Sequence, residues 1–197
     1  MTARKNHTRN KLSDNYIRIE QIDLQKNGKT ALKVNLLAVA LFVILLLAGA
    51  PLLLRYESIA YSGMPGDLIQ IVILFIAVAL YMIFHELTHA AVMKYYGASS
   101  VRFGFTGMYA YAGSTQDYFD KYSYSRIALA PVIVWGIIFT IRCLALSSEW
   151  FALAYMLQIS NISGAAGDIY VVFHFRKYPA DTWFRDTGVE MSVYQAE

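Results

Sequence analysis

The sequence is poor in cysteine and in charge. Only one of its 197 residues, Cys143, is a cysteine, which excludes an internal disulfide framework. Charged residues make up 16% of the chain and hydrophobic residues 57%, a balance that soluble domains of this length seldom have. Internal repeats and low-complexity tracts are also missing. The length suits one compact domain, and the composition predicts that this domain is an integral membrane protein.

A dense basic run is absent too, although positive charge gathers near the N-terminus. Eight of the 17 lysines and arginines precede Val34. They form no compact cluster and no recognisable binding motif, so they do not indicate a nucleic-acid partner. They fit the positive-inside rule, and the segment is too long and polar for the first region of a cleaved signal peptide. We expect residues 1–33 to be a basic cytoplasmic tail.

Four apolar stretches approach or exceed the roughly 20 residues that a membrane-spanning helix needs. They cover residues 34–54, 68–93, 127–146 and 150–175. Lysines and arginines lie between the second and third stretches and after the fourth, which places those segments in the cytoplasm. The sequence thus predicts an all-α integral membrane protein of the cell membrane. It has about four transmembrane helices over residues 34–175, a cytoplasmic tail over 176–197, and both termini in the cytoplasm.

Two other segments alternate between apolar and polar or small residues. The alternation within residues 97–125, around Gly107, predicts a short β-hairpin between the second and third helices. Such a hairpin can bind an extended substrate, and an ordered loop at the lipid headgroups is the alternative. A shorter alternation in the N-terminal tail fits either a small hairpin or an interfacial segment, and its residues are Ile17, Ile19, Ile22 and Leu24.

The most informative motif lies near the end of the second stretch, where His85-Glu86-Leu87-Thr88-His89 places two histidines four residues apart. On a helix they share one face and can bind one zinc ion, with Glu86 beside them as a base for a zinc-bound water. An ionisable group in lipid costs about 2.5–3.5 kcal/mol, so idle ones are rare there. The plainer alternative is a pair of packed or hydrogen-bonded histidines.

A catalytic zinc ion usually has three protein ligands and one open position. The fourth stretch offers Asp168, at a depth similar to that of His85 when both stretches run in the same direction. Asn161 lies seven residues earlier, close to two helical turns, and so shares a face with Asp168. The alternatives are helix packing for Asp168 and an interhelical hydrogen bond for Asn161. His174 is either a further ligand or an interfacial histidine.

These residues predict peptide hydrolysis in the cytoplasmic half of the bilayer. Zinc would polarise the scissile carbonyl, and Glu86 would act as general base and then as acid. Asn161 would bind the substrate backbone or the developing oxyanion. The expected cofactor is one zinc ion, and the expected partner is a membrane-embedded or membrane-associated protein or peptide. Two other functions stay open: a non-catalytic membrane scaffold that retains a metal site, and a transporter or haem-binding bundle.

The motif and the Asn161-to-Asp168 element resemble the site-2 proteases, which are intramembrane zinc metalloproteases. In size the chain most resembles the small bacterial membrane proteins called putative zincin peptidases, over roughly residues 68–175. The resemblance implies that Glu86 is catalytic and that the metal ligands are His85, His89 and Asp168.

The chain departs from the site-2 proteases near the last ligand. The Asn-to-Asp spacing is one residue shorter, Gly164 replaces a proline, and Ile169 replaces the glycine after the aspartate. A fused PDZ-like domain does not fit in this length, so we expect substrate choice to depend on the membrane domain or on a partner.

Overall fold

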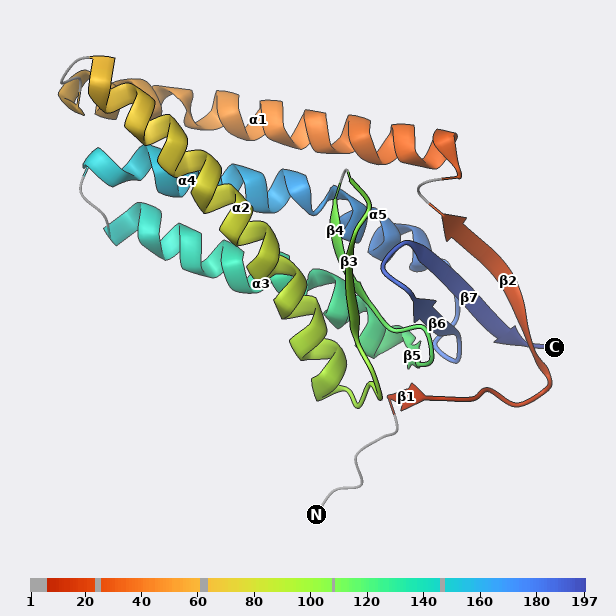
Figure 1. Ribbon diagram of the computed structural model, residues 1–197. Coiled ribbons are helices and arrows are strands. Elements are labelled where there is room, and N and C mark those ends of the chain that lie inside the picture. The colour runs from red at the N-terminus through yellow and green to blue at the C-terminus, as the bar shows by residue number, and fades with distance from the viewer. Residues whose placement is uncertain (1–6, 24–25, 61–63, 108, 146–147) are drawn as a thin grey trace. The chain divides into compact units, whose positions relative to one another are not determined.

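The computed structural model describes residues 7–23, 26–60, 64–107, 109–145 and 148–197. The chain divides into two compact units, which we name after their main secondary structure. The helical unit comprises Val34–His85 and Pro131–Gly167, and the sheet unit comprises Met1–Lys33, Glu86–Ala130 and Asp168–Glu197. The helices that contribute residues to both units are α1 (Gly28–Ala60), α2 (Met64–Tyr95) and α3 (Lys121–Ala145) (Figure 1).

Among the described residues, three helices are long and apolar enough to cross a membrane. The segments are Gly28–Leu54 of α1, Leu68–Tyr95 of α2 and Lys121–Ala145 of α3. Only 6% of the most apolar window of α1, and 11% of that of α2, is buried inside the protein. Soluble proteins rarely expose so much contiguous apolar surface, so these helices suit a lipid environment.

The fourth apolar stretch is not one continuous helix. It forms α4 (Ser148–Gly164) and α5 (Ala166–Phe175), of 17 and 10 residues, which are separated at Ala165. The single long helix expected over residues 150–175 is therefore wrong. Gly164 directly precedes the break, and glycine in a helix interior is about 1 kcal/mol less favourable than alanine.

Within the helical unit, α4 is hydrogen-bonded to α1, α2 and α3. The Tyr155 hydroxyl donates to the Leu45 carbonyl of α1 (2.6 Å). The Asn161 amide donates to the Val132 carbonyl of α3 (3.2 Å), and the Tyr81 hydroxyl of α2 donates to the Asn161 side-chain oxygen (2.8 Å). Lipid offers polar groups no partners, so such bonds between helices are needed wherever polar side chains are buried.

The sheet unit contains a five-stranded antiparallel sheet of order β1-β5-β6-β7-β2 (Figure 1). The strands are β1 (Thr8–Arg9), β2 (Tyr16–Asp23), β5 (Tyr118–Asp120), β6 (Trp183–Asp186) and β7 (Glu190–Ala196). The protein is therefore mostly helical, as expected, but not purely all-α. Segments near both ends of the chain, which charge and polarity had marked as tails, pair with each other and with β5 to form this sheet.

Short alternations explain why β6 and β7 pair. Phe184 of β6 lies opposite Val193 of β7, and both are buried. Because side chains repeat every second residue in a strand, Met191 joins them on the same face. Gly188 in the connecting turn has a φ of 86°, a conformation that favours glycine. A β-hairpin with one apolar face results.

The alternation in the N-terminal segment belongs to an edge strand of the sheet. β2 pairs with β7 along its length and carries a bulge. Ile22 is buried, whereas Ile17 and Ile19 are exposed. Leu24 lies outside the described residues. The segment is therefore a strand paired with the C-terminal strand β7, which corrects the local hairpin; the interfacial alternative stays a prediction.

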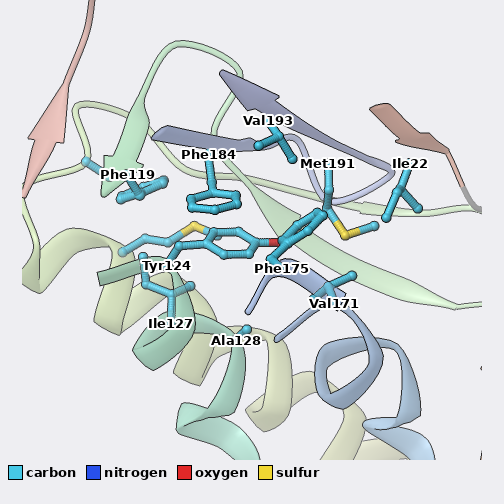
Figure 2. Packing of buried hydrophobic residues seen from close by; sticks show 12 residues of the cluster. Ile22, Phe119, Tyr124, Ile127, Ala128, Val171, Phe175, Phe184, Met191 and Val193 are labelled. Atoms are coloured by element: carbon cyan, nitrogen blue, oxygen red, sulfur yellow. The ribbon is translucent and has the colours of Figure 1, made fainter. Parts of the chain in front are cut away.

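Aromatic rings fill the core between this sheet and helices α3 and α5 (Figure 2). Tyr124 stacks on Phe184 with ring centroids 5.0 Å apart, and Phe175 lies 5.1 Å from Phe184. Large buried rings contribute much of the energy of a core. The other members of the cluster are Ile22, Met93, Ala98, Phe119, Ile127, Ala128, Val171, Met191 and Val193.

The hairpin expected between the second and third apolar stretches is confirmed. β3 (Arg102–Phe105) pairs antiparallel with β4 (Ala110–Gly113). The Ser114 N–H donates to the Asp186 carbonyl at the end of β6 (2.7 Å). Gly113 has no side chain, which lets the backbone of the β6–β7 turn approach closely. The hairpin is thus attached to the larger sheet of the same unit.

Candidate metal centre

The HExxH pentapeptide lies on one turn of α2. One ligand atom each of His85, Glu86 and His89 lies within 4.8 Å of the others. In the part of the chain that the structure describes, this is the one group of at least three His, Cys, Asp or Glu side chains arranged so closely. His85 is 8% exposed and His89 is 7% exposed. The i, i+4 spacing on a helix accounts for the cluster.

His89 contacts two other elements of the sheet unit. Its Nδ1 lies 2.9 Å from the Ile127 carbonyl of α3. Its Nε2 lies 3.5 Å from Oδ1 of Asp168, in the first turn of α5. An imidazole nitrogen and a carboxylate oxygen are both ligands that zinc accepts. The structure therefore brings Asp168 beside His89, and its role as a metal ligand stays a prediction.

His85 has its hydrogen-bond partners in the helical unit. Its Nδ1 lies 2.9 Å from the Tyr81 hydroxyl, one turn earlier on α2. That hydroxyl donates to the Asn161 oxygen at 2.8 Å, and the Asn161 amide in turn donates to Val132. Asn161 is 0% exposed. The interhelical hydrogen bond is therefore present, whereas contact of Asn161 with a substrate or an oxyanion stays a prediction.

Glu86 borders the hairpin of the sheet unit. Its carboxylate accepts a hydrogen bond from the backbone of Ala112 on β4. It also interacts electrostatically with His89, Asp168 and Asp186. The Thr106 N–H donates to the Tyr109 carbonyl, so in this register the N–H groups of Ala110 and Ala112 point away from β3. This edge of β4 therefore lies next to Glu86.

Asp186, at the end of β6, is a further acidic group in the sheet unit near His89 and Asp168. Its side chain accepts hydrogen bonds from the Gly188 N–H (2.7 Å) and the Tyr124 hydroxyl (3.3 Å). Burial raises the pKa of Asp186 to about 6, although the Gly188 N–H and His89 act in the opposite direction. No sequence pattern pointed to Asp186, because it lies in a polar segment expected to be a tail.

His174 contacts a different set of residues. Its Nε2 lies 2.7 Å from Oε1 of Glu20 on β2. The other carboxylate oxygen, Oε2, is contacted by Tyr178 and Lys177. Burial alone would raise the pKa of Glu20, but the hydrogen bonds from Tyr178, His174 and Lys177 outweigh it and lower that pKa. This network ties β2 to α5.

The donor set suits zinc. The two imidazoles of the cluster on α2, and the carboxylate beside His89, are ligand types that catalytic zinc sites use. Each imidazole has its Nδ1 in a hydrogen bond, to Ile127 for His89 and to Tyr81 for His85, as zinc-ligating histidines usually have at one ring nitrogen. The residues present therefore fit the ion that the motif implies.

An HExxH helix is the defining feature of the zincin class of metallopeptidases. Residues 77–183 match a family model described as putative zincin peptidase. The match covers more than half of the chain, and the chain belongs to this family. The matched segment contains the HExxH motif, the β3–β4 hairpin and Asp168. Neither the curated proteins nor the solved structures contain a significant match.

Proposed function

We propose that the protein is a zinc-dependent intramembrane metalloprotease, similar in its chemistry to the site-2 proteases. Its substrates are peptide bonds of membrane-embedded or membrane-associated proteins or peptides. The observation that carries the proposal is the position of the His85–Glu86–His89 cluster on α2, a helix that is long and apolar enough to cross a membrane. A peptidase motif on such a helix gives access to bonds at membrane depth.

The proposal includes a topology. Together α4 and α5 are longer than the roughly 20 residues that one crossing needs, and they would supply a fourth crossing of the cell membrane. Four crossings would leave both termini in the cytoplasm, in agreement with the positive-inside rule. His85 lies ten residues before the end of α2 at Tyr95, about 15 Å along the helix. The motif would then lie in the cytoplasmic half of the bilayer.

In the proposed mechanism, His85, His89 and Asp168 hold the ion. Bound zinc would polarise a water molecule and the scissile carbonyl. Glu86 takes a proton from the attacking water and later transfers one to the leaving amine. The backbone of Ala112 orients the Glu86 carboxylate through its hydrogen bond.

The β3–β4 hairpin is our candidate for substrate binding. A peptide bond in a membrane helix must unwind before it can be cut, and the unwound strand then needs hydrogen-bond partners. The edge of β4 beside Glu86 offers them. Ala110→Pro removes one backbone N–H from the same edge of β4 to which the Ala112 N–H belongs. We expect it to reduce cleavage well below that of Ala110→Ser, and unchanged cleavage would exclude strand addition there.

The deciding experiment combines zinc content with cleavage of a membrane-peptide library. We expect about one zinc ion in wild type and in Glu86→Gln, and loss of zinc in His85→Ala. His174→Ala, which removes a histidine paired with Glu20, is the matched control and should keep zinc. Loss of the general base should lower cleavage by about 10²–10⁴-fold in Glu86→Gln.

Two results would contradict the proposal. Wild-type protein that is folded but does not bind zinc would exclude a zinc enzyme. Stoichiometric zinc with equal processing of the library by wild type and Glu86→Gln would instead favour the alternative, a membrane scaffold that keeps a metal site.

A further inference from the structure

We propose that Pro131 is a positioning residue for the metal ligand His89. The inference rests on the proposed role of His89 in zinc binding, and it concerns how the chain holds this imidazole. The link between the two residues is a backbone carbonyl of α3.

Pro131 lies inside α3 and is fully buried. Proline has no backbone N–H, so the carbonyl four residues earlier, that of Ile127, lacks its usual helical donor. This carbonyl accepts a hydrogen bond from Nδ1 of His89 instead, at 2.9 Å and in a buried setting. A proline in a helix interior is destabilising because this hydrogen bond is lost. Helix α3 therefore lacks one internal hydrogen bond at the Ile127 carbonyl, which is the carbonyl that His89 contacts.

The bond from His89 requires a proton on Nδ1, because a carbonyl can only accept. A metal ion bound by this imidazole would then be held through Nε2. Nε2 is also the atom that lies 3.5 Å from Asp168. In metal sites, removing a hydrogen-bond partner of a ligating histidine typically lowers metal affinity by 10–100-fold.

Two substitutions restore the missing N–H and thereby offer Ile127 a competing helical donor. Pro131→Ala does so with a smaller side chain, and Pro131→Val does so with nearly the same volume. The matched control is Pro51→Ala, because Pro51 also lies inside a helix, α1, but is exposed. We expect the zinc dissociation constant, measured by chelator competition in detergent, to rise about 10–100-fold for both Pro131 variants and to stay unchanged for Pro51→Ala.

A second readout does not depend on zinc. In metal-free protein with ¹⁵N-labelled histidine, the Nδ1 proton of His89 should exchange slowly with solvent in wild type, because it is bonded to the buried Ile127 carbonyl, and faster in the Pro131 variants. Equal zinc affinity in all four proteins, or equal exchange of this proton, would overturn the inference. Absence of zinc from the wild type would instead contradict the proposed function, and the exchange measurement would still test the role of Pro131.

A separate observation supports a similar role for Tyr81 and Asn161 toward His85. The Tyr81 hydroxyl uses its single proton to bond Asn161, so it must accept one from Nδ1 of His85. We infer that Asn161 orients Tyr81, and that Tyr81 holds the His85 imidazole by its Nδ1.

Tyr81→Phe removes the hydroxyl and keeps the ring, which packs near Trp135 and Phe139. Tyr155→Phe is the matched control, because it removes a tyrosine hydroxyl bonded to Leu45 in the same unit. We expect zinc affinity to fall about 10–100-fold in Tyr81→Phe and to stay unchanged in Tyr155→Phe. Equal affinity of the two variants would overturn this second inference.

Discussion

Replacing Phe184 by alanine tests whether the C-terminal residues belong to the fold or form a tail. The Phe184 side chain is 1% exposed and lies between Tyr124 and Phe175, at centroid distances of 5.0 Å and 5.1 Å. Its cross-strand neighbour Val193 is 0% exposed. A tail residue would be replaceable at no cost, whereas a residue with these contacts would not.

The expected loss follows from these contacts. Truncating a buried phenylalanine costs about 3–5 kcal/mol, and two ring contacts place Phe184 toward the upper end, about 4–5 kcal/mol. In a protein of this size each kcal/mol lowers Tm by about 2–4 °C. We therefore expect Tm to fall by about 8–20 °C.

Thermal unfolding of detergent-solubilised protein, followed by tryptophan fluorescence, measures this loss. Zinc should first be removed with a chelator, because a bound ion adds its own stabilisation. Phe105→Ala is the control: Phe105 is 69% exposed on β3, so its replacement should change the free energy of unfolding by less than about 0.5 kcal/mol. Equal Tm values for the two variants would refute the assignment of β6 to the core.

Three further predictions concern stability. Glu20 has a lowered pKa, so its contribution is present above the ordinary value of 4.5 and is lost as the pH falls through the folded-state pKa. Glu20→Gln should therefore lower the free energy of unfolding by about 0.5–1 kcal/mol at pH 7, because Glu20 is partly exposed, and by much less at pH 3; equal losses in urea titrations at both pH values would contradict this. Gly113→Ala places a Cβ against the backbone of Thr187, so Tm should fall by several degrees. Gly164→Ala is the control: an added Cβ there meets nothing within 4 Å, so Tm should stay unchanged or rise. Chelation of zinc from wild type should lower Tm, by an amount that grows with the free zinc concentration of the reference sample; no change would indicate that zinc does not bind the folded state.

The parts of the site that could be predicted are those with local spacing. Residues i and i+4 of a helix lie close together regardless of the rest of the fold. The proximity of His85 and His89 therefore follows from the sequence alone. The same holds for the hairpin at residues 102–113, whose two strands are neighbours along the chain. The family match confirms the zincin motif and leaves the intramembrane activity to experiment.

The partners of these residues could not be predicted, because they lie far away in sequence. Ile127 is 38 residues from His89, and Asn161 is 80 residues from Tyr81. One sequence signal did exist: a proline inside an apolar helix marks the carbonyl four residues earlier as available. For Pro131 this rule identifies the Ile127 carbonyl as available, but it does not identify His89 as the donor that bonds it.

The five-stranded sheet was missed because charge dominated the interpretation of both ends. The positive-inside rule assigns a side of the membrane and says nothing about structure there. β6 has only four residues and β7 has seven, each with charged or polar neighbours. Strand formation at such segments depends on packing against a partner more than on intrinsic preference. They pair with each other, but their other partners, β5 and β2, are far away in the sequence.

The pairing of β2 with β7 has a consequence for when the third candidate ligand is positioned. Helix α5 carries Asp168 at its start, and it is attached to the sheet by Val171 and Phe175 in the core and by the His174–Glu20 pair. Strand pairing between distant segments is slow, because a long loop must close before the contacts form. The two histidines of α2 can approach each other as soon as that helix forms, because their contact is local. We expect the Asp168 carboxylate to join His89 later, once β7 has paired with β2, and therefore to be out of place in chains truncated before β6.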